Sequence, residues 1–156
     1  MGWTGHAGFR SDGDDIRFDT PSLVFLAPPV EPLEDYRLEA VFEVEERGAI
    51  PCIGLTFGET PTTDRRMLVA SLGKGSFFIG RYIDGSPTSI HTFKARVDVK
   101  ATTHRIAVEV RDGVVSVFLD GEHAGDFQAA DLGAEGRPGL LAQQVSGRIT
   151  EVRLLR

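Results

Sequence analysis

Length, composition and charge exclude several classes of protein. The chain has 156 residues, enough for one packed core without disulfides, and its 41% hydrophobic and 26% charged residues exclude a disordered or collagen-like protein. A formal net charge of −6, with no basic cluster longer than Arg65-Arg66, argues against nucleic acid or an anionic membrane surface as partner.

The predicted elements are all strands. Strand signals recur about every ten residues, and no window of helical length carries a 3.6-residue apolar stripe. The pattern predicts one all-β domain over residues 1–156, a two-sheet antiparallel jelly-roll sandwich. The expected strands cover 16–18, 23–26, 36–45, 52–57, 67–72, 77–83, 89–93, 103–111, 114–119, 124–127, 139–142 and 148–155, with a loop at 129–138.

The first segment holds a cluster of carboxylates. Asp12, Asp14 and Asp15 stand around Gly13, and clustered carboxylates are the ligands that calcium prefers. The turn therefore suggests a calcium site, with a solvated acidic turn as the alternative. No other cofactor is expected.

The segment 36–45 alternates strictly. Leu38 and Val44 fall on one face, and Glu43 and Glu45 on the other. Glycosidases use paired carboxylates, but the outer face of a sandwich carries the same pattern. The sequence favours the solvated outer face.

Two residues that often bind metals are predicted to be structural. Cys52 is the lone cysteine and stands among Ile50, Ile53 and Leu55, which predicts a small core residue. His104 follows the parity of the apolar positions in the segment 103–111, which places its ring at the margin of the core.

The segment 77–83 suggests a binding face. Phe78, Gly80 and Tyr82 fall on the face opposite Phe77 and Ile79, so two aromatic rings flank a position without a side chain. If exposed, this face could hold a flat ligand, with further contacts expected at its edge from Arg81, Asp84 and His91. The alternatives are that the face is buried or is covered by a neighbouring strand.

The segment 103–121 predicts a hairpin. Asp112-Gly113 is the two-residue loop that hairpins prefer. Such a loop pairs Val110 with Val115, and the same register continues to Ile106 with Leu119. Phe118 then stands on the face opposite the apolar one and is a further candidate contact. Asp120-Gly121 turns the chain again, toward 124–127.

The order of these elements resembles the concanavalin A-like lectin/glucanase superfamily, in particular its laminin-G-like and 3-keto-disaccharide hydrolase-like domains. The resembling pieces are Asp35-Tyr-Arg-Leu-Glu-Ala, Ile53-Gly-Leu-Thr-Phe, Gly75-Ser-Phe-Phe-Ile-Gly-Arg-Tyr-Ile-Asp-Gly85, His104-Arg-Ile-Ala-Val-Glu-Val-Arg-Asp-Gly-Val-Val-Ser-Val-Phe-Leu-Asp-Gly121, and Gly136-Arg-Pro-Gly-Leu-Leu-Ala. The resemblance implies carbohydrate binding, glycoside cleavage or protein adhesion. The Glu-x-Asp-x-Glu strand of the laminarinase-like hydrolases is absent, and Glu43-Val-Glu45 lacks the third carboxylate.

We therefore expect a non-catalytic ligand-recognition module, with a carbohydrate as its ligand. The first alternative is a protein-interaction or assembly module, and the second is a small glycoside hydrolase that uses Glu43 and Glu45. Because the N-terminus lacks the basic and apolar parts of a signal peptide, the chain as written is expected in the cytoplasm. As a fragment of a longer chain it is expected to be secreted.

Overall fold

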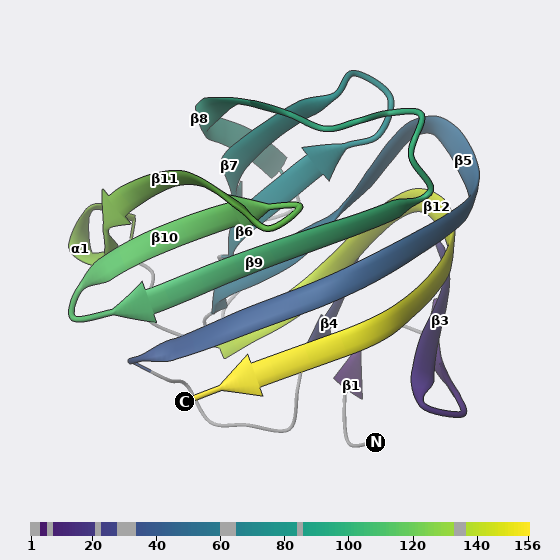
Figure 1. Ribbon diagram of the computed structural model, residues 1–156, viewed down its shortest axis with the longest axis horizontal. Coiled ribbons are helices and arrows are strands. Elements are labelled where there is room, and N and C mark those ends of the chain that lie inside the picture. Colours follow the sequence, from purple (N-terminus) through teal and green to yellow (C-terminus); the bar gives the residue numbers. More distant parts are fainter. Residues whose placement is uncertain are drawn as a thin grey trace.

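A computed structural model describes residues 4–5, 8–20, 23–27, 34–59, 65–83, 86–132 and 137–156, and nearly all of them lie in antiparallel strands (Figure 1). Within these ranges no helix is long and apolar enough to cross a membrane. The elements are β1 (Thr4–Gly5), β2 (Phe9–Asp12), β3 (Asp15–Thr20), β4 (Val24–Ala27), β5 (Tyr36–Glu59), β6 (Arg65–Ser71), β7 (Ser76–Ile83), β8 (Ser86–Arg96), β9 (Thr103–Arg111), β10 (Val114–Leu119), β11 (Glu122–Gln128), α1 (Ala129–Leu132) and β12 (Arg137–Leu155).

One folded sheet forms both layers of the sandwich. The long strands β5 and β12 pair with each other along most of their length and pass from one layer into the other. The layer that we call the β7 layer contains β1, β4, residues 137–143 of β12, residues 52–59 of β5, and then β6, β7 and β8. The β9 layer contains β2, β3, residues 145–155 of β12, residues 36–47 of β5, and then β9, β10 and β11. The predicted jelly-roll sandwich is confirmed.

The bend between the layers corrects the predicted strand boundaries. Residues 36–45 and 52–57 were expected as two strands, as were 139–142 and 148–155, but each pair is one continuous bent strand. Gln144 has a φ of 48°, which turns β12, and its side-chain oxygen accepts the Ile50 N–H at 2.9 Å. β5 pairs with β12 on both sides of the bend, Arg47 with Val145 and Cys52 with Gln143, so the polar break near Gly48 does not end the strand.

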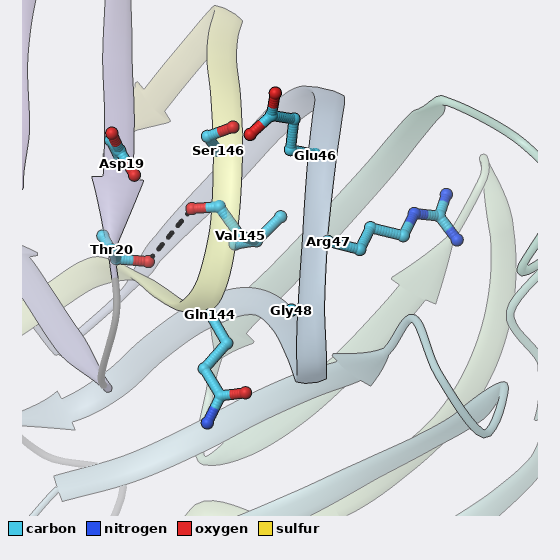
Figure 2. A pocket seen from close by; sticks show the side chains of 8 residues that line it. All are labelled: Asp19, Thr20, Glu46, Arg47, Gly48, Gln144, Val145 and Ser146. Atoms are coloured by element: carbon cyan, nitrogen blue, oxygen red, sulfur yellow. Dashed lines mark hydrogen bonds between the residues drawn. The ribbon is translucent and has the colours of Figure 1, made fainter.

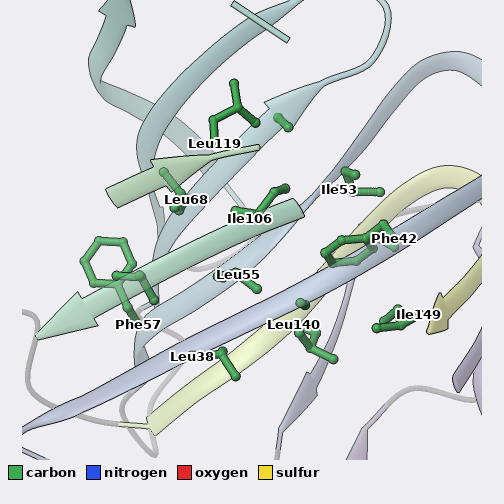
Figure 3. Close-up of a cluster of buried hydrophobic side chains, with 14 of the residues drawn as sticks. Leu38, Phe42, Ile53, Leu55, Phe57, Leu68, Ile106, Leu119, Leu140 and Ile149 are labelled. Atoms are coloured by element: carbon green, nitrogen blue, oxygen red, sulfur yellow. The ribbon is translucent and has the colours of Figure 1, made fainter. Parts of the chain in front are cut away.

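The core lies between the two layers. Figure 3 shows its members from both layers, among them Leu38, Phe42 and Ile106 facing Ile53 and Leu55. A polar contact also joins the layers, since the buried Tyr36 hydroxyl donates to the Phe57 carbonyl oxygen at 2.6 Å. Burial raises the pKa of Tyr36 far above its ordinary value.

The hairpin predicted at Asp112-Gly113 is confirmed. Both turn residues have positive φ, and Val110 pairs with Val115, as Val108 does with Val117. The next turn, at Asp120-Gly121, also has positive φ and leads into β11, which pairs with β10. The expected loop at 129–138 instead begins with the short helix α1.

Candidate functional site

The outer face of the β7 layer carries a row of apolar side chains. Pairing aligns Phe25 with Leu141, Leu141 with Gly54, Gly54 with Val69, and Val69 with Phe78 across five strands. Met67, Val69 and Leu141 are buried in a cluster of their own, separate from the main core, against which Phe78 and Tyr82 pack. This face is therefore an apolar surface outside the sandwich.

A hollow in this face, the outer-face pocket, has a volume of about 280 Å³. Apolar side chains form most of its wall, and hydroxyls and one amide stand among them. Its lining consists of Leu23, Ile50, Cys52, Met67, Val69, Phe78, Pro87, Thr88, Ser89, Leu141 and Gln143. Phe78 is half-buried, whereas Thr88 and Ser89 are exposed.

The alternation predicted for the segment 77–83 agrees with the structure. Phe77 and Ile79 are fully buried in the core, while Phe78 and Tyr82 lie on the outer face. Phe78 lines the pocket, and Tyr82 packs beside it, with its ring centroid 5.3 Å from that of Phe25. The space above Gly80, between these two rings, is filled by Met67, because a Cβ on Gly80 would lie 3.3 Å from the Met67 Cε.

The other expected contacts of this face are not gathered there. His91 pairs with Ile79 and lies on the opposite side, where its ring centroid is 5.1 Å from that of Phe93 and 5.2 Å from that of Phe127. Its placement beside Phe78 was wrong, because β8 meets β7 with a bulge that the sequence does not reveal. Arg81 lies two residues after Ile79 on β7, so its side chain is on the same face of the strand as Ile79, opposite Phe78. Asp84 lies outside the described residues.

Phe118 lies on the outer face of the other layer. It pairs with Ala107 as predicted and is half-buried. The Arg37 guanidinium lies 4.6 Å from its ring centroid, and the His123 ring lies 5.5 Å away. The structure therefore separates Phe118 from Phe78.

A second hollow, the bend cleft, lies where the strands turn and has a volume of about 390 Å³. Pairing places Asp19, Ser146 and Glu46 in one row across β3, β12 and β5, and Figure 2 shows their polar groups on the same side. Arg47 points away from this row, and donates to the carbonyl oxygens of Ala101 and Leu72 at 2.6 and 3.3 Å. The sequence does not reveal this cleft, because its residues come from three segments far apart in the chain.

A third hollow, of about 400 Å³, adjoins the bend cleft. It shares Asp19, Glu46 and Ser146 with the cleft and adds Arg10, Arg17, Glu45 and neighbouring residues. Arg17 and Glu45 form an ion pair at 3.3 Å. Glu43 and Glu45, the carboxylates considered for glycoside cleavage, are both exposed.

The acidic turn considered for calcium joins β2 to β3. Gly13 has a φ of 64°, Asp14 is exposed, and Asp15 accepts a hydrogen bond from Arg148 at 3.1 Å. The strand position of Asp12 is described but its side chain is not. Among the side chains that the structure describes, no three of His, Cys, Asp or Glu gather as a metal site would require.

Cys52 and His104 differ in outcome. Cys52 was expected in the core but lines the outer-face pocket, because its side chain lies on the opposite face of β5 from the core residues Ile53 and Leu55. Burial raises the pKa of its thiol to about 11. His104 was expected at the margin of the core and is fully buried, and its Nε2 lies 3.0 Å from the Ala101 carbonyl oxygen. Burial lowers the pKa of His104, against the opposing effects of that hydrogen bond and of Asp120.

Comparison with known proteins identifies the architecture. No family model and no curated protein matches the chain. Among solved structures it is similar over its whole length to carbohydrate-binding module CBM66 from Bacillus subtilis, at 14% identity and a TM-score of 0.83, covering 96% of that chain. It is also similar to sheep galectin-11, at 14% identity and a TM-score of 0.57, over 88% of this chain and 99% of that one. A third similar structure is the exoplasmic/lumenal domain of VIP36 in its Ca²⁺-bound form, at 13% identity and a TM-score of 0.66, over 98% and 82% of the two chains. The chain thus shares the antiparallel jelly-roll sandwich fold of these structures, as the sequence predicted.

Proposed function

We propose that the chain is a non-catalytic carbohydrate-binding module and that the outer-face pocket is its primary contact with sugar. The observation that carries this proposal is a half-buried aromatic ring, Phe78, in a hollow whose lining includes the Ser89 hydroxyl and the Gln143 amide. A sugar ring has an apolar C–H face and an edge of hydroxyls, so it needs an apolar platform beside a few polar groups.

The volume and charge of the pocket fit a single neutral ring. Its volume of about 280 Å³ is near the lower end of the range for ligand pockets, which is roughly 300 to 1,000 Å³. Its described lining holds no carboxylate and no imidazole, and the raised pKa keeps the Cys52 thiol neutral at pH 7. We therefore propose that binding at this pocket requires neither a cofactor nor calcium. A calcium ion on the turn at 12–15 stays a separate prediction.

The fold supports the same proposal. The three similar structures are a carbohydrate-binding module, a galectin and the VIP36 domain, and further crystal structures of that VIP36 domain carry Man2 or Man3GlcNAc. All three match the chain over most of its length. Because one fold hosts many activities, the proposal depends mainly on the pocket, and the fold is supporting evidence.

The test is a glycan array followed by calorimetry on the glycans that bind, in calcium and in EDTA. Phe78→Ala is expected to weaken binding about ten-fold or more, since stacking and lost apolar contact together cost about 1.5 kcal/mol. The matched control is Phe118→Ala, which removes a half-buried ring from the outer face of the other layer and should leave binding unchanged. If no glycan binds the wild-type chain under either condition, the proposal is wrong.

One observation favours a protein partner as the second candidate. Ile50 lines the pocket and is 59% exposed, and Ile90 of β8 is 45% exposed. Exposed apolar side chains beside a hollow are also typical of protein interfaces. Light scattering over a range of concentrations tests self-association: a dimer that Ile50→Ser dissociates would support this candidate, and a monomer at all concentrations would argue against a second copy as the partner.

A further inference from the structure

The bend cleft and the outer-face pocket meet at one short ridge. The cleft is lined by Gly48 and Gln144, and the pocket by Ile50 and Gln143, which lie two positions and one position away on the same two strands. The Ile50 backbone holds the ridge together: its N–H donates to the Gln144 side chain, and its carbonyl accepts from the Gln143 side chain, each at 2.9 Å. A ligand longer than one ring that occupies the pocket can therefore reach the cleft by crossing this ridge.

The cleft offers polar groups with unused hydrogen-bonding capacity. Asp19 and Glu46 are exposed on either side of Ser146, in a row set by strand pairing. No residue within the described ranges donates a hydrogen bond to the side chain of Asp19 or Glu46, whereas neighbouring Glu45 is bound by Arg17. Within the described part of the chain, Asp19 and Glu46 can therefore accept hydrogen bonds from a ligand without losing a protein partner.

The chemistry of this row selects one kind of ligand. A carboxylate accepts from hydroxyl groups, and a hydrogen bond to a charged acceptor is stronger than one between neutral groups. A serine hydroxyl can both donate and accept. Sugar hydroxyls can donate to such a row, whereas a uronic acid or a sulfate would bring negative charge beside Asp19 and Glu46.

We propose that the bend cleft is a second subsite for the same glycan and takes a neutral, hydroxyl-rich sugar unit. This inference rests on the proposed function and deepens it. The module then binds neutral oligosaccharides of two or more units more tightly than single sugars, and it discriminates against acidic glycans. Phe78 supplies the platform for one unit, while Asp19, Ser146 and Glu46 supply hydrogen bonds to a neighbouring unit.

Calorimetry with cello-, manno- and fructo-oligosaccharides of one to six units tests the subsite, with oligogalacturonides as the acidic series. Glu46→Gln and Asp19→Asn keep the shape of each side chain and remove its charge. We expect each to weaken binding of the longer neutral ligands about ten-fold, the cost of a hydrogen bond to a charged group, and to leave binding of single sugars unchanged. Glu43→Gln is the matched control, since it removes an exposed carboxylate of β5 that does not line the cleft.

The outcomes separate this inference from the proposed function. If Phe78→Ala abolishes binding and both cleft variants bind every length as the wild type does, the subsite is wrong and the proposed function stands. If the cleft variants abolish binding and Phe78→Ala does not, the cleft is a sugar site and the pocket is not. If EDTA removes binding and calcium restores it through Asp19 and Glu46, the row is a cation site and the inference is wrong. If none of these oligosaccharides and no array glycan binds the wild type, both proposals are wrong.

Discussion

The Tyr36 hydroxyl connects the two layers, and its removal gives a prediction with two parts. Tyr36 is fully buried, and its hydroxyl donates to the Phe57 carbonyl oxygen at 2.6 Å. Tyr36→Phe keeps the ring and removes this bond, leaving a carbonyl with less hydrogen bonding inside the core. At pH 7 we expect the free energy of unfolding to fall by about 1 to 3 kcal/mol.

The second part is a dependence on pH. Burial raises the pKa of Tyr36 in the folded state, so the unfolded chain loses this proton first as the pH increases. The stability from the protonated hydroxyl is fully present below the unfolded pKa of about 10 and decreases above it, by about 1.4 kcal/mol at pH 11. Because Tyr36→Phe has no proton to lose, the difference between variant and wild type should shrink between pH 9 and pH 11.

Urea unfolding at several pH values between 7 and 11 measures both parts. The change at Cys52, whose pKa is also raised, is common to both proteins and cancels in the comparison. Tyr82→Phe is the matched control, since Tyr82 is the only other tyrosine and is partly exposed on the outer face. A difference between Tyr36→Phe and wild type that stays constant from pH 7 to pH 11 would refute the reasoning.

Two further predictions concern the hairpin and the buried histidine. Gly113→Ala should lower the free energy of unfolding in urea by about 1 kcal/mol, because the φ of 78° at this position disfavours a side chain, while no atom lies within 4 Å of the new Cβ. Gly73→Ala is the control, since Gly73 has no positive φ, and it should cost less. Equal costs for the two variants would contradict the argument from φ. Burial lowers the pKa of His104, so the stability that this residue contributes is present above its unfolded pKa of about 6.5 and is lost as the pH falls below it. His104→Gln should therefore flatten the decrease in unfolding free energy between pH 7.5 and pH 5, and an unchanged slope would count against it.

Local sequence patterns predicted much of the fold. The turn Asp112-Gly113 predicted the register of β9 and β10 over the whole length of the hairpin, because a two-residue turn leaves one way to pair the strands that it joins. Strict alternation predicted that Phe77 and Ile79 face the core and that Phe78 faces outward. Both signals act between residues close in sequence, so no tertiary information is needed.

The bend could not be predicted in this way. Residues 46–51 contain Gly48 and Pro51, which are typical of a strand end, yet β5 continues through them. Strand β12 pairs with β5 up to Arg47 and again from Cys52, and between these points its Gln143 and Gln144 side chains bind the Ile50 backbone. Cys52 was misplaced for a related reason, since an apolar run with Ile53 and Leu55 does not show that the outer face of this layer is also apolar.

The sequence by itself determined the fold class, the central hairpin and the outward direction of Phe78, since each follows from alternation and turn chemistry within one stretch of chain. Only the tertiary structure decided which side chains meet. It moved His91 to the other side of β7, placed Phe118 on the opposite outer face, and brought Asp19, Glu46 and Ser146 into one row. The physical reason is that pairing between distant strands depends on how the whole sheet closes around its core, and that closure is a property of all the strands together.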